Sequence, residues 1–222
     1  MKSKLLTILV LAILVSLAVN HLKKQLQVEA ETVETAYEDT EQAFQNIKTK
    51  NQDFVRLLNF TDRSLPVVQS KDNKEYLSRD PDGEYDRMGT LFQAAEVNAA
   101  SRNIVIYGHS SSRNNARLTP LKDKKYIQAN LMFTVTQDDQ QQAYQIIAYF
   151  NVDLEHLDIA FYQTDWRNDS DFRQYLQQAQ DRSLLPGTPD ITADSEECLT
   201  LVTCDLRHKS HRWIVVAVPL IA

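Results

Sequence analysis

The chain has 222 residues and a formal net charge of −6 at pH 7. This length suits one domain with an appended segment, and the acidic balance without a basic stripe excludes a typical nucleic-acid-binding surface. The four glycines form neither GxxxxGK[ST] nor GxGxxG, so the sequence gives no support to a nucleotide site.

Residues 1–24 have the pattern of an export signal or a membrane anchor. Lys2 and Lys4 precede an apolar run over residues 5–19, and further lysines follow it. The length of this run lies between that of a signal-peptide core and that of a spanning helix. Cleavage after Ala18 is one alternative. We expect an uncleaved anchor, because the polar, helix-favouring stretch that follows would suit a stalk beside a bilayer.

Residues 25–60 are predicted to form an N-terminal helical segment. From Gln25 to Leu58 the chain is rich in Glu, Gln, Ala and Lys, contains no Pro or Gly, and carries a thin stripe of apolar residues. This pattern favours two helices, or one broken helix, with a scaffold role.

Residues 61–222 are predicted to form a mostly β domain. Short apolar and β-branched runs alternate there with turn-prone clusters, and seven or eight such strands predict a closed barrel or a sandwich. One helix interrupts them from Ser170 to about Arg182, with Asp169 or Ser170 as its N-cap. The predicted strands are 65–69, 90–93, 103–107, 130–136, 143–150, 199–203 and 213–218.

The two cysteines, Cys198 and Cys204, flank one of these predicted strands. Six strand residues separate their Cα atoms by roughly 20 Å, whereas a disulfide requires less than about 7 Å. We therefore expect at least one free thiol. Cys204 ends its strand, where a barrel presents side chains to its mouth, although position alone favours a buried structural cysteine. A nucleophile would need a base or a positive neighbour, because only about 3% of an ordinary thiol is ionised at pH 7.

Two residues could activate such a thiol. His109 follows the predicted strand 103–107 and Gly108, and it opens a polar loop, which would expose its imidazole for general acid work. Arg212 begins the last apolar strand. If that strand pairs antiparallel with the cysteine strand, Arg212 lies near the thiol and could stabilise a thiolate or an oxyanion. Taken singly, each is better explained as an ordinary surface residue.

An acidic cluster over residues 80–86 invites a calcium site. Counted from Asp80, however, an EF-hand loop would need Gly at position six and Glu at position twelve, and neither is present. We therefore predict a solvated turn and no metal.

Several segments together resemble the sortase family, and class B in particular. Residues 200–204 (TLVTC) resemble the segment around the sortase nucleophile, residues 103–109 (NIVIYGH) resemble the histidine segment, and Arg212 matches the arginine of the last strand. The resemblance runs in order from about residue 37 to the C-terminus. It also includes 65–69 (LPVVQ), Asp72-Asn73, Tyr76-Leu77, 89–92 (GTLF) and the helix through 172–176.

The resemblance implies a closed eight-stranded sortase-type β-barrel with N-terminal helices and an inserted helix before the cysteine strand. It further implies a cysteine transpeptidase without metal or organic cofactor. Cys204 would attack after a Thr in the C-terminal sorting motif of an exported protein, and an amine from a cell-wall peptide or a pilin would resolve the thioacyl enzyme. His109 would act as acid and base and Arg212 as oxyanion donor. The expected location is the outer face of a Gram-positive membrane, with a single N-terminal anchor.

Some positions bear on substrate binding. Ser110 and Val202 depart from the usual class B residues and, with Thr203, would border the active site; Tyr175 and Leu176 on the inserted helix are expected to form walls of the motif pocket. Two alternatives remain open. The domain could be a catalytically idle binder of sorting peptides, or a cysteine peptidase in which water resolves the intermediate.

Overall fold

The computed structural model describes residues 23–24, 42, 44–111, 117–138, 140–187 and 195–220. The chain divides into two compact units, residues 1–43 and residues 44–222. All but two residues of the predicted anchor, and half of the predicted helical segment, lie outside the described residues. Among the residues that are described, no helix is long and apolar enough to cross a membrane.

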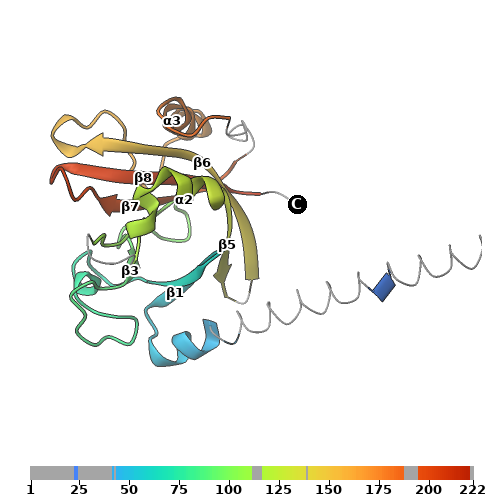
Figure 1. The fold of residues 1–222 in the computed structure, drawn as a ribbon, viewed down its shortest axis with the longest axis vertical. Coiled ribbons are helices and arrows are strands. Elements are labelled where there is room, and N and C mark those ends of the chain that lie inside the picture. The colour runs from blue at the N-terminus through green and yellow to red at the C-terminus, as the bar shows by residue number, and fades with distance from the viewer. Residues whose placement is uncertain are drawn as a thin grey trace, which may run out of the picture. The chain divides into compact units, whose positions relative to one another are not determined.

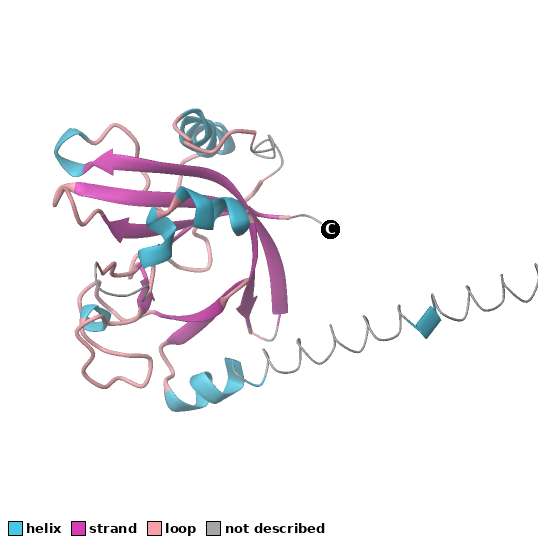
Figure 2. Ribbon diagram, viewed as in Figure 1, coloured by secondary structure: helices cyan, strands magenta, loops and turns pink. Residues whose placement is uncertain are grey.

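The second unit contains a closed barrel of eight strands, as predicted (Figure 1). Around the barrel the strands follow the order β1-β2-β3-β4-β7-β8-β6-β5. Figure 2 shows that helices contribute little beside this sheet, so the domain is mostly β. The strands are β1 (Phe54–Phe60), β2 (Arg63–Val68), β3 (Leu91–Gln93), β4 (Asn103–Tyr107), β5 (Met132–Gln137), β6 (Gln140–Asp153), β7 (Cys198–Cys204) and β8 (His211–Pro219).

The barrel begins earlier than the sequence analysis predicted. Residues 44–50 are helical, but β1 starts at Phe54, so the prediction of helix to Leu58 is wrong at its C-terminal end. The Asn51 side chain accepts a hydrogen bond from the amide of Asp53 and turns the chain there. Beyond it, β1 pairs with β2 on one side and β5 on the other. Composition alone could not reveal this, because the strand depends on pairing with β2 and with the distant β5.

The pairing of three strands positions the chemistry of the molecule. β4 and β7 run parallel, with Asn103 opposite Cys198 at one end and Tyr107 opposite Val202 near the other. β7 and β8 run antiparallel, and Cys204 is the register partner of Arg212. The residues that follow β4, end β7 and begin β8 therefore meet at one mouth of the barrel.

The helix predicted before the cysteine strand is α3 (Asp169–Asp181), which lies beside β6 (Figure 1). Its N-cap is Asn168, whose side chain accepts from the Asp171 amide, and neither Asp169 nor Ser170 has that role. The remaining helices are short: η1 (Glu75–Leu77), η2 (Thr119–Lys122), α2 (Lys124–Ala129) and η3 (Leu154–His156). The sequence analysis predicted none of these four.

Candidate active site

Both cysteines are free, which confirms the prediction of at least one free thiol. Cys198 is buried, and its burial raises the pKa of the thiol well above the ordinary value. Cys204 is half-buried at the end of β7 and faces the mouth of the barrel. Only Cys204 therefore combines a thiol with access to a ligand.

Arg212 lies directly across the β7–β8 ladder from Cys204. Its Nη1 donates to the carbonyl oxygens of Lys209, at 2.9 Å, and His211, at 2.8 Å. These bonds hold the guanidinium against the turn that joins the two strands. The side chain is thereby oriented at the same mouth as the thiol, as the antiparallel pairing in the sequence analysis required.

The loop that carries His109 is fastened to the cysteine strand by three hydrogen bonds. The Gly108 amide donates to the Val202 carbonyl at 3.1 Å, and Thr203 Oγ1 donates to the Gly108 carbonyl at 2.7 Å. Ser110 Oγ donates to the Cys204 carbonyl at 2.8 Å. The backbones on either side of His109 and Cys204 are therefore held together.

The three predicted catalytic residues line one pocket of about 400 Å³. Val202 and Thr203, which were predicted to border the active site, line it as well, and Ser110 supports it through its bond to the Cys204 backbone. The complete lining is Leu77, Phe92, Tyr107, Gly108, His109, Leu154, Phe161, Tyr162, Val202, Thr203, Cys204 and Arg212.

The apolar residues of this pocket were missed by sequence reasoning. Leu77, Leu154 and Tyr162 are 39%, 40% and 54% exposed and line this pocket. Leu77 ends the short helix η1, whereas Leu154 and Tyr162 both lie in the segment between β6 and α3. No spacing rule joins them, and only the closed barrel brings them to one rim, where they offer an apolar surface to an extended ligand.

The prediction that Tyr175 and Leu176 form walls of the pocket is corrected by the structure. Both are buried on the inner face of α3, at 4% and 0% exposure, and neither lines the pocket. The Tyr175 hydroxyl lies 3.1 Å from Thr200 Oγ1 in the core. The helix was placed correctly, but its apolar face packs on the barrel and does not line a site.

The acidic segment 80–86 is a closed turn. The Asp80 carboxylate accepts from the amides of Asp82 and Glu84, while Asp86 forms an ion pair with Arg117. Among the described residues no group of three His, Cys, Asp or Glu side chains could hold a metal ion.

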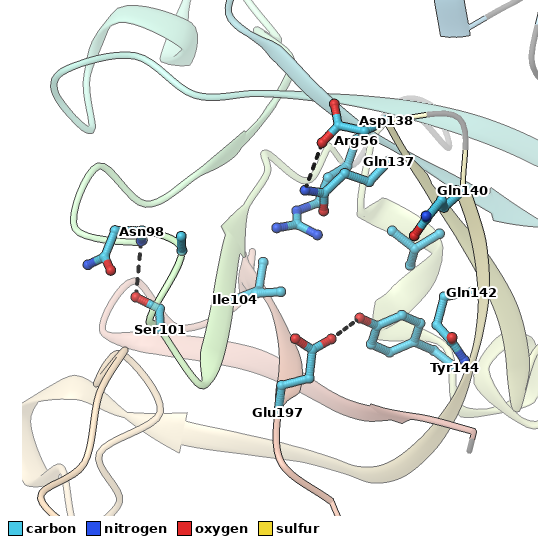
Figure 3. Close-up of a pocket in the computed structure, with 12 residues that line it drawn as sticks. Arg56, Asn98, Ser101, Ile104, Gln137, Asp138, Gln140, Gln142, Tyr144 and Glu197 are labelled. Carbon is cyan, nitrogen blue, oxygen red and sulfur yellow. Dashed lines mark hydrogen bonds between the residues drawn. The ribbon is translucent and has the colours of Figure 1, made fainter. Parts of the chain in front are cut away.

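A second pocket, of about 390 Å³, lies where β4 and β7 begin and therefore at the other end of the parallel pair. Figure 3 shows the Arg56 guanidinium and the bonded Tyr144–Glu197 pair around this hollow. Arg56 Nε donates to Gln93 Oε1 at 2.8 Å, and burial lowers the pKa of the guanidinium. The residues that line this second pocket include polar side chains but neither cysteine nor histidine.

Comparisons by family model, by sequence and by structure all find sortases. The family model described as the Sortase domain matches residues 58–220. The curated Sortase B of Staphylococcus aureus is 25% identical over 244 aligned positions, covering 100% of this chain and 98% of that protein. The structure of Clostridium perfringens sortase B has a TM-score of 0.70 at 26% identity, covering 80% of this chain and 99% of that one. A Staphylococcus aureus sortase B–substrate complex has a TM-score of 0.70 at 22% identity, covering 87% and 98%.

Proposed function

The chain belongs to the sortase family, in class B, and from this premise we propose that it is a cysteine transpeptidase with Cys204 as nucleophile, His109 as acid and base, and Arg212 as oxyanion donor. The observation that carries the assignment is the register of Cys204 against Arg212, with His109 lining the same pocket. Three groups of the required chemistry meet there, whereas the second pocket holds none of this set.

The proposed reaction has two acyl transfers. The Cys204 thiolate attacks the carbonyl carbon of the scissile peptide bond, and Arg212 stabilises the oxyanion that forms. When the C–N bond breaks, His109 gives its proton to the departing amine, which leaves a thioester on Cys204. The incoming amine then loses a proton to His109 as it attacks the thioester, and the thiolate departs.

The proposed substrate is an exported protein with a C-terminal sorting motif that is cut after Thr. The apolar rim at Leu77, Leu154 and Tyr162 supports this, since an extended peptide could lay its side chains against that rim. The proposed acceptor is an amine of a cell-wall peptide or, as the second choice, a pilin lysine. No metal or organic cofactor takes part in this scheme.

The proposed location is the outer face of a Gram-positive cell membrane. The apolar run over residues 5–19, with lysines on both sides, supports an N-terminal anchor with the barrel outside.

The test uses the full chain in detergent micelles, incubated with peptides of the NPxT and LPxT types and with triglycine as the amine. We expect an amine-coupled product that is absent with Cys204→Ala. A product that forms only by hydrolysis, whatever the amine concentration, would favour the cysteine peptidase. The absence of any thioacyl adduct by intact mass would favour the idle binding domain.

A further inference from the structure

The His109 ring is held by a backbone carbonyl. Its Nε2 lies 2.9 Å from the Leu77 carbonyl oxygen. Because a carbonyl oxygen can only accept, Nε2 must carry hydrogen in both the neutral and the charged ring. In the neutral ring the lone pair is therefore on Nδ1, and Nδ1 is the nitrogen that can accept and return a proton.

The position of the Leu77 carbonyl is fixed by the turn over residues 86–89. Gly89 has a φ of +56°, and a Cβ placed on it would collide with the Tyr76 carbonyl oxygen and lie 2.8 Å from that of Leu77. The Asp86 amide donates to the Ser78 carbonyl at 3.0 Å. This close packing means that the carbonyl of Leu77 cannot shift unless the turn shifts with it.

Arg117 fastens that turn from the other side. Its Nη2 lies 2.6 Å from Asp86 Oδ2, and its Nε donates to the Gly89 carbonyl. The next residue, Leu118, donates its amide to the His109 carbonyl at 3.3 Å. Residues 117–118 therefore hold the backbone of His109 and, through the turn, the carbonyl that faces its ring.

We infer that Arg117 is a positioning residue for His109: by clamping the turn over residues 86–89 it keeps the Leu77 carbonyl on Nε2 and leaves Nδ1 to exchange the proton with the substrate amine. The part concerning the substrate rests on the proposed function. Arg117 does not line the pocket, so it acts through His109 and not on the peptide.

The first test is the tautomer of His109, measured in the full chain in detergent micelles with ¹⁵N-labelled histidine at alkaline pH. Long-range ¹H–¹⁵N spectra distinguish a protonated from a bare ring nitrogen, and the signals that disappear in His109→Gln identify this ring. We expect Nε2–H to dominate in the wild type and a mixture of both tautomers in Arg117→Met. A wild-type ring protonated on Nδ1, or an unchanged tautomer in a folded Arg117→Met, would overturn the inference.

The second test separates orientation from binding. Arg117→Met is expected to lower kcat by about tenfold to a hundredfold and to change KM by less than about threefold, because a misplaced acid impairs the proton transfer but not the peptide site. Asp86→Asn breaks the same ion pair with almost no change of volume and should act in the same direction; it serves if Arg117→Met does not fold. A loss confined to KM in either folded variant would overturn the inference.

The matched control is Arg79→Met. Arg79 lies in the same loop region and also donates to a glycine carbonyl, that of Gly83, but its ion-pair partner is Glu75 and not Asp86. In Arg79→Met the tautomer of His109 and the value of kcat should equal those of the wild type. The tautomer measurement needs no substrate, so a failure of the proposed function, seen as the absence of a thioacyl adduct, is distinguishable from a failure of this inference.

Discussion

Each end of the β4–β7 pair carries a cysteine, but one cysteine is buried in the core and the other faces a pocket. Where the strands begin, Asn103 and Cys198 are fully buried, and the Asn103 side chain donates to the Phe161 and Gln163 carbonyls. Its Oδ1 also accepts from Thr200 Oγ1 and from the Cys198 thiol. Where the strands end, Cys204 is half-exposed beside Arg212 and the His109 loop.

The difference shows how burial separates two thiols of one strand, since only Cys204 faces a pocket. At the first end the Cys198 thiol donates to the Asn103 side chain within the core, and burial raises the pKa of Cys198. At the second end the backbone is fastened, but the thiol and the guanidinium still face a pocket. The same strand therefore holds an inert and an accessible cysteine within seven residues.

Replacing each of the two cysteines by alanine, one at a time, should give the largest difference in activity between the two ends. Cys204→Ala is expected to reduce transpeptidation by at least about 10³-fold, because the nucleophile is lost. Cys198→Ala should retain the wild-type rate per folded molecule. Product formation from a sorting peptide and triglycine measures both, and iodoacetamide should label the native wild type at Cys204 alone. Equal loss of activity in the two variants would contradict the division of roles.

Removing the cation at the open end should have the next largest effect. Arg212→Ala is expected to lower kcat/KM by about 10²–10³-fold, the usual cost of removing an oxyanion donor. Arg207→Ala is the matched control, since Arg207 lies in the same turn and is exposed but does not line the pocket. The measurement is the steady-state kcat/KM of the two variants. Similar losses in both would indicate that general positive charge, and not the position opposite Cys204, matters.

At the open end, local sequence predicted where the strands stop, whereas the assignment of Cys204, His109 and Arg212 to one site came from the resemblance to the sortase family. The residues around Cys204, His109 and Arg212 combine β-branched runs with a glycine and a polar turn, and these predicted where each strand stops. Antiparallel pairing of neighbouring strands then sufficed to place Arg212 opposite Cys204.

The rest depended on contacts that no local pattern records. The apolar rim combines the segment between β2 and β3 with the segment between β6 and α3. The composition of residues 54–58 favours a helix, but pairing with β2 and β5 makes them a strand. Tyr175 and Leu176 show the converse error, since an apolar helix face predicts burial equally well against a core or a ligand. The role of Arg117 was likewise invisible, because it depends on a contact with Asp86 thirty-one residues away.

A smaller effect should appear at the buried end at alkaline pH. Because the pKa of Cys198 is raised in the fold, the unfolded chain loses this proton above pH about 8.5 while the folded chain keeps it. The free energy of unfolding should therefore fall as pH rises, by up to about 1.4 kcal/mol per pH unit for this group. Urea unfolding at several pH values between about 8 and 10 measures the slope. A slope that is the same in Cys198→Ala would show that other groups cause it.

The smallest effect is expected from Ser110→Ala, which sharpens the comparison by loosening only the link between the His109 loop and the Cys204 strand. Loss of the bond from Ser110 Oγ to the Cys204 carbonyl should cost about 0.5–1.5 kcal/mol in stability and reduce activity by less than about tenfold. Ser101→Ala, at the other end of β4, is the control; its hydroxyl accepts from the Asn98 amide outside the active pocket, and its variant should keep full activity. A Ser110→Ala enzyme as active as the wild type would mean that the bonds through Gly108 alone hold His109 beside the thiol.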